Sequence, residues 1–93
     1  MGERSTDQEA TRAQILFVQR LRRLVTARER LPLHDEQRRL LNYALYSTYR
    51  DCAALGIRAE AGAIIGLPRQ LSRRQVRDAI VLDSPLGNLA RLR

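Results

Sequence analysis

The stretch DEQRRLLNYALYSTYRDCAALG, residues 35–56, decides the fold that this sequence predicts. Apolar and small residues recur in it at steps of three and four, the spacing of one helix face; they are Leu41, Ala44, Leu45, Thr48, Cys52 and Leu55. More apolar residues fall on its other faces, and a helix that is apolar nearly all round is usually the central one. We expect this helix to span 36–55, with Asp35 as its N-cap and Gly56 in the left-handed conformation after it.

An amphipathic helix is predicted ahead of it, over residues 7–30. Thr6 and Glu9 have the spacing of a capping box, so residues 1–5 are expected to form a flexible tail. Such a helix is about 36 Å long, which favours packing of part of it against a second copy of the chain. Arg28 falls on the apolar stripe, where it either marks the end of the core or pairs with an acid of another chain. The stripe itself consists of Ala10, Ala13, Phe17, Leu21 and Leu24.

A short third helix is expected after Gly56. The residues IRAEAGAIIG, 57–66, are small and apolar and predict a helix over 58–65 that Gly66 closes. A strand through 63–65 is the competing interpretation, because short apolar runs are ambiguous between the two structures. Pro68 then forces a turn.

A fourth helix is predicted to follow Ser72. Ser72 and Gln75 have capping-box spacing, and Leu71 and Val76 occupy the two positions of a hydrophobic staple. The helix should extend to about residue 82, and residues 83–93 are expected to form a turn and a basic tail. The residues that should point inward are Val76, Ala79 and Ile80.

Size and composition agree with a small all-α domain. A chain of 93 residues makes one domain, and 44% apolar residues exclude a disordered basic tail. With 4% aromatic residues, the core must consist of Leu, Ile, Val and Ala, which suits packed helices. We therefore expect one helical domain over residues 1–93 with three to five helices. It would combine a long N-terminal helix with a tri-helical, helix-turn-helix-like unit over 36–82.

The sequence offers no support for catalysis. It has one histidine, His34, which is expected on the surface, and one cysteine, Cys52, which is expected as a buried inert thiol. A single cysteine excludes an internal disulfide. No nucleophile–base set, metal-ligand cluster or glycine-rich phosphate loop is evident, so we expect no enzyme activity, cofactor or metal. Without a signal peptide or a membrane-length apolar run, the expected location is the cytoplasm, with no membrane partner.

The charge of the chain points to an acidic partner. The formal net charge is +7 and all seventeen basic residues are arginine. The excess is uneven, because 1–30 carry +3, 31–66 are neutral and 67–93 carry +4. A small domain this basic usually meets nucleic acid, an acidic protein or an anionic membrane.

The stretch LSRRQVRDAI, residues 71–80, places two arginines at a helix start. The helix dipole disfavours cations there, and the cost becomes a benefit when the helix end faces phosphate. We expect DNA contacts from this helix, with arginines on phosphates and glutamines as candidate base readers. The candidate residues are Arg69, Gln70, Arg73, Arg74, Gln75 and Arg77. The alternative is an ordinary amphipathic surface helix, with Arg74 and Asp78 as a solvated pair.

The same stretch resembles the recognition helix of GntR-type winged-helix regulators. The pattern S-R-x-x-V-R-x-A-[LI] is common in that helix, and residues 72–80 match it. Gly87 falls where those proteins have a glycine at the junction of helix and wing. Two features depart from the family. Gln70 stands where it has glycine, and six residues after Gly87 are too few for a two-stranded wing. The resemblance implies a DNA-reading helix and covers residues 72–87 alone.

A second candidate surface lies on the central helix, where four residues at helical spacing form one ridge: Arg39, Tyr43, Tyr46 and Arg50. Tyrosine and arginine are enriched at protein-interface hot spots, and they also stack on unpaired bases. The other interpretation is that neighbouring helices cover the tyrosines. The ridge and the stripe of the first helix, with Phe17 and Leu21, suit a helical adaptor that binds an acidic protein. This adaptor is the alternative to a dimeric DNA-binding regulator of transcription or mobile-element factor.

Overall fold

The computed structural model describes the backbone of residues 2–82 and the side chains of residues 8–82. It contains four α-helices in the order α1 (Gly2–Arg30), α2 (Asp35–Ala54), α3 (Arg58–Ile65) and α4 (Arg73–Val81). No strand occurs in the described part of the chain, which confirms the expected all-α class. The expected turn and basic tail over 83–93 lie outside the described residues.

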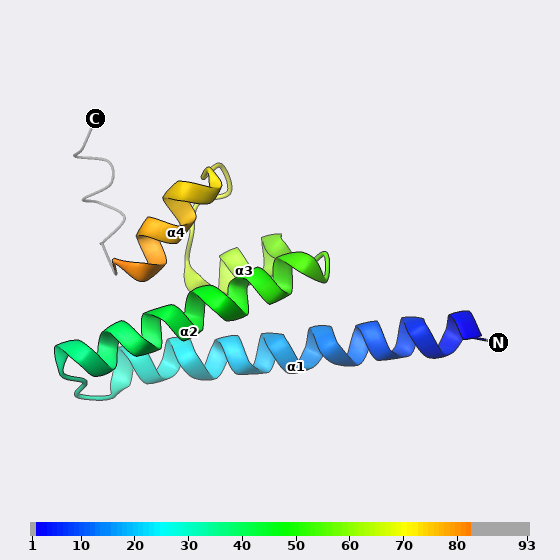
Figure 1. Ribbon diagram of the computed structural model, residues 1–93, viewed down its shortest axis with the longest axis horizontal. Coiled ribbons are helices and arrows are strands. Elements are labelled where there is room, and N and C mark those ends of the chain that lie inside the picture. The colour runs from blue at the N-terminus through cyan, green and yellow to red at the C-terminus, as the bar shows by residue number, and fades with distance from the viewer. Residues whose placement is uncertain (1, 83–93) are drawn as a thin grey trace.

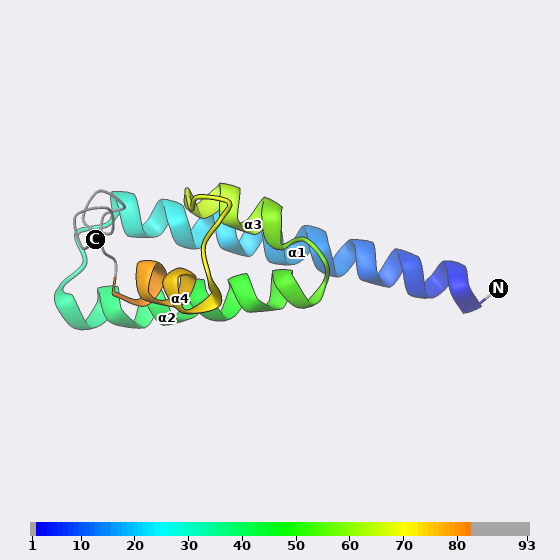
Figure 2. The ribbon, with the colours of Figure 1, turned by 90° about the horizontal axis from the view of Figure 1, so that it is seen from above.

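The helices are arranged around α2. Helices α1 and α2 form an antiparallel hairpin, α3 packs on both, and α4 lies on the side of α2 that faces away from α1 (Figures 1 and 2). The side-chain amide of Gln14 donates a hydrogen bond of 2.8 Å to the carbonyl oxygen of Leu55, just after the end of α2. The part of α1 that precedes Gln14 projects past the other helices (Figure 1).

All four helices contribute to one hydrophobic core. Leu21 of α1, Leu45 of α2, Ala61 of α3 and Ile80 of α4 each have an exposed fraction of 0%. The remaining members of the core cluster are Tyr49, Cys52 and Val76. The core is thus mainly aliphatic, as the composition predicted, and the buried positions of α4 are the three that its sequence pattern indicated: Val76, Ala79 and Ile80.

Two polar residues of α2 are also buried, and both are satisfied. The Thr48 hydroxyl donates to the carbonyl of Ala44 at 2.8 Å. The Asn42 side chain, 3% exposed, accepts a hydrogen bond of 3.2 Å from the Arg28 guanidinium. Arg28 on the apolar stripe of α1 thus donates to a buried amide of its own chain, a contact that the sequence did not indicate.

The starts of α1 and α2 differ from the sequence prediction. Helix α1 begins at Gly2, where a tail had been expected up to residue 5. A helix interior tolerates threonine at low cost, so the helix continues through Thr6 and the capping-box pattern there does not mark its first residue. Helix α2 is capped by His34 and not by Asp35: the His34 Nδ1 atom accepts the Gln37 amide at 3.3 Å, and the Gln37 side chain accepts the His34 amide at 3.2 Å. His34 has the extended backbone that an N-cap needs, which leaves Asp35 as the first helical residue.

Left-handed glycines end α2 and α3. Gly56 has φ 82° and Gly66 has φ 90°. After α2, the Ile57 amide donates to Cys52 and the Gly56 amide donates to Ala53, both at 3.0 Å. This is the Schellman pattern, and it turns the chain from α2 into α3. Helix α3 spans 58–65 as predicted, so the strand interpretation of 63–65 is wrong.

A matched pair of glycine substitutions tests this account. A Cβ atom meets no neighbour within 4 Å at either Gly56 or Gly62, so the difference between them is conformational. Gly56→Ala should lower the free energy of unfolding by about 1 kcal/mol, because the left-handed conformation is strained for alanine. Gly62→Ala, inside α3, should raise it by up to about 1 kcal/mol. Urea denaturation monitored by circular dichroism measures both, and equal effects would contradict the assigned cap.

Candidate anion-binding site

The start of α4 is held in place by a capping box. The Ser72 hydroxyl accepts the Gln75 amide at 3.2 Å, and the Gln75 side chain accepts the Ser72 amide at 2.8 Å. Leu71 and Val76, on either side of this box, both belong to the hydrophobic core, as expected for a staple. The predicted start of the helix is therefore confirmed, and Arg73 and Arg74 occupy its first two positions.

All six candidate nucleic-acid residues are exposed. They are Arg69 and Gln70 in the segment before α4, and Arg73, Arg74, Gln75 and Arg77 on the helix itself. Among the described side chains, those of residues 8–82, none of these four arginines forms an ion pair, and the suggested pair between Arg74 and Asp78 is not made. The charge of this surface is thus not neutralised by the described part of the chain.

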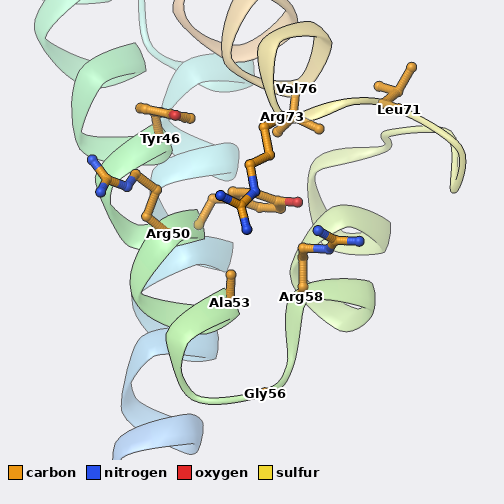
Figure 3. A pocket seen from close by; sticks show the side chains of 9 residues that line it. Tyr46, Arg50, Ala53, Gly56, Arg58, Leu71, Arg73 and Val76 are labelled. Atoms are coloured by element: carbon orange, nitrogen blue, oxygen red, sulfur yellow. The ribbon is translucent and has the colours of Figure 1, made fainter.

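A hollow of about 410 Å³ opens between α2, the start of α3 and the start of α4. Three helices each contribute one arginine to it: Arg50 from α2, Arg58 from α3 and Arg73 from α4 (Figure 3). Among the described residues, no aspartate or glutamate lines it. The remaining lining residues are Tyr46, Tyr49, Ala53, Gly56, Leu71 and Val76. We call this feature the arginine hollow.

The arginines lie at different parts of the hollow. Arg73 projects across it, Arg58 borders it on one side, and Arg50 lies beside Tyr46 on the other (Figure 3). The Arg50 guanidinium carbon is 6.0 Å from the centre of the Tyr46 ring, at the outer range of a cation–π contact. A second hollow of about 440 Å³ shares Arg58 with the first and adds Arg69. The positive surface therefore continues from α2 to the segment before α4.

Arg58 was not singled out from the sequence, although a signal existed. It is the first residue of α3, just as Arg73 is the first residue of α4. The conflict between a cation and the positive end of a helix therefore applies to Arg58 as well. Residues 59–72 separate the two arginines along the chain. Only the fold shows that both helix starts border the same hollow.

The proposed ridge of α2 is only partly covered. Tyr46 is half-buried against the core, whereas Tyr43 is 54% exposed and Arg39 and Arg50 are exposed. The ridge therefore presents Tyr43, and not Tyr46, as its exposed aromatic residue.

The apolar stripe of α1 packs against its own chain in part. Leu21 is fully buried in the core, and Phe17 is half-buried against it. Leu21 is therefore occupied by the fold itself, whereas Phe17 keeps a partly exposed side.

The segment between α3 and α4 spans residues 66–72. Helix-turn-helix motifs join their two helices by about three or four residues, so this connection is longer. Both helices pack on α2. Residues 36–82 thus form a tri-helical unit without the short turn of a helix-turn-helix motif.

Cys52 lies inside the core and is fully buried. Burial raises the pKa of its thiol, and the nearby carboxylates of Asp51 and Glu60 raise it further. The thiol is therefore held in its protonated, unreactive form at neutral pH. Among the described residues, no group of three or more His, Cys, Asp or Glu side chains is placed to hold a metal ion.

Comparisons with models of protein families, with curated proteins and with solved structures found no match to this chain. In the part of the chain that the structure describes, no helix has both the length and the apolar character needed to cross a membrane. Function must therefore be inferred from the arginines at the start of α4 and around the arginine hollow.

Arg73 should lower the stability of the fold, because it places a positive charge at the positive end of α4. Arg73→Glu should raise the free energy of unfolding by about 0.3–1 kcal/mol, since an acid suits the positive end of α4. Arg30→Glu makes the same charge change in the last turn of α1, where a cation is favourable, and should lower it by a similar amount. Urea denaturation at low salt distinguishes the two. A loss of stability in Arg73→Glu would show that Arg73 is a structural residue.

Proposed function

We propose that this protein binds DNA, as a small regulator of transcription or mobile-element factor, and that the start of α4 holds the phosphates. The observation that carries the proposal is the exposed, un-neutralised arginine surface of α4, whose backbone is fixed by the Ser72 capping box. Guanidinium groups and the first amides of a helix both favour phosphate. Gln70 and Gln75 are the candidates for contacts to base edges, although Gln75 also completes the cap.

The proposal includes a cytoplasmic location and a homodimer. One helix contacts few bases, so DNA-binding proteins of this size usually pair. Helix α1 supports pairing, because its first part projects past the other helices (Figure 1). Two exposed apolar residues lie next to this projection, Ile15 at 51% and Leu16 at 61%. A second copy packed along this part of α1 would bury them.

Fluorescence anisotropy with a random-sequence duplex, titrated from about 50 to 200 mM salt, tests the proposal. We expect micromolar binding at low salt and a steep loss of affinity as salt rises. Arg74→Gln with Arg77→Gln should weaken binding at least about tenfold and reduce the salt slope by about 2, because two phosphate contacts are removed. Neither residue lines the arginine hollow.

Arg20→Gln with Arg23→Gln is the matched control. It removes the same charge from exposed positions of α1, and it should retain most of the affinity. An equal loss in both double variants, or no loss in either, would contradict the assignment of α4. Circular dichroism confirms that the variants remain folded.

An adaptor that binds an acidic protein is the second candidate, favoured by one observation. Leu40 and Tyr43 are 65% and 54% exposed and lie three residues apart, so they are neighbours on α2 beside Arg39. If this is the functional surface, a protein complex should survive nuclease treatment and be lost in Tyr43→Ala, measured by pull-down with an acidic partner. A complex that Tyr43→Ala leaves intact would exclude this surface.

A further inference from the structure

The arginine hollow has the features of a ligand site that is separate from the outer surface of α4. We propose that it binds a small molecule with two or more phosphate groups, of about the size of a nucleoside diphosphate. The ligand would bind between Arg50, Arg58 and Arg73, with its organic part against Tyr46 and the apolar floor of the hollow. This site does not depend on the binding of DNA.

Charge is the first argument for an anion. Arginine stays protonated in proteins, and three helices each place one arginine at the hollow: Arg73 projects across it, Arg58 borders it, and the Arg50 guanidinium lies on the Tyr46 side (Figure 3). Among the side chains of residues 8–82, no acid lines the hollow and none of the three arginines is held in an ion pair. Like charges raise each other's energy. A ligand with several negative charges removes that cost and accepts paired hydrogen bonds from the planar guanidinium groups.

The start of α3 supplies a second, backbone contribution. Helices α2 and α4 each begin with a complete capping box, whereas α3 begins at Arg58 with Ile57 as its N-cap and no side-chain hydrogen bond to its first amides. Gly56 and Arg58, on either side of this N-cap, both line the hollow. Phosphate oxygens are suitable acceptors for the first amides of a helix.

The floor of the hollow argues for an organic ligand rather than a bare ion. Tyr49 is 8% exposed and Val76 is 6% exposed, so both are fixed by the core, and Leu71 continues the apolar surface. Tyr46 adds an aromatic wall that is half-buried. A volume of about 410 Å³ lies within the range of about 300–1,000 Å³ that is usual for small-molecule sites.

The hollow differs in shape from the outer surface of α4 that is proposed to bind duplex DNA. Arg74 and Arg77 are exposed on α4 outside the hollow, where they are open to a large partner. Arg50 and Arg58 are exposed as well, but they border a recess that a compact ligand can enter. Arg73 belongs to both regions, so a ligand in the hollow should compete with duplex DNA for this one residue.

Isothermal titration calorimetry with pyrophosphate and with adenosine diphosphate tests the proposal. We expect saturable binding of one ligand per chain, with orthophosphate weaker than pyrophosphate because it carries fewer charges. Arg58→Gln and Arg50→Gln should each raise the dissociation constant of pyrophosphate by about tenfold or more. Arg23→Gln on α1 makes the same charge change at an exposed position, and it should leave the constant within about twofold. Tighter binding of adenosine diphosphate than of pyrophosphate would support contact of the organic part with Tyr46.

Two results would overturn the proposal. One is the absence of saturable binding by the wild-type protein at about 1 mM ligand. The other is an equal loss in Arg58→Gln, Arg50→Gln and Arg23→Gln, which would mean diffuse attraction by the net charge. Circular dichroism and urea denaturation of each variant exclude unfolding as the cause. Because Arg74 and Arg77 are unchanged in these variants, the result is independent of whether the duplex experiment succeeds.

Discussion

Burial of α2 is the constraint on which the rest of the structure depends. Helices α1, α3 and α4 all pack on it, and its fully buried residues Leu45 and Cys52 lie in the one core cluster that joins the four helices of the described chain. A chain of 93 residues buries a modest fraction of its surface, so it cannot divide that surface between two cores. The three remaining helices must therefore meet on α2, and this brings the starts of α3 and α4 to the same side of the molecule.

The parts of the fold that local chemistry determines were predictable from the sequence. The bounds of α3, the Ser72 cap and the inward positions of α4 each follow from residues within one turn or one helix. The errors arose where two local solutions compete. Asp35 is of a preferred N-cap type and histidine is not, yet His34 has the extended backbone and its ring accepts the Gln37 amide. The partner of Arg28 could not be predicted either. Its hydrogen bond to Asn42 joins α1 to α2, and no spacing of residues within one helix indicates a contact between two helices.

The candidate site, too, has a part that the sequence identified and a part that only the fold shows. Arg73 and Arg74 were identifiable because a cation at a helix start conflicts with the dipole within a single stretch of sequence. The arginine hollow could not be identified in this way, because Arg50, Arg58 and Arg73 border it from three separate helices. The exposure of the two tyrosines of α2 also could not be predicted from their spacing. The spacing of α2 places Tyr43 and Tyr46 on one ridge, but the cover over each depends on where the neighbouring helices end, so Tyr43 is exposed and Tyr46 is half-buried.

Arg73 connects the two proposed sites and determines the sign of their coupling. A phosphorylated ligand in the hollow would neutralise Arg73, and the positive potential at the start of α4 would fall. DNA bound at α4 would in turn draw the Arg73 guanidinium toward a backbone phosphate and away from the hollow. Each partner would therefore weaken the binding of the other by the same factor, as linkage requires. The coupling needs no movement of a helix, because one side chain is shared, and the capping box that fixes Ser72 keeps that side chain within reach of both partners.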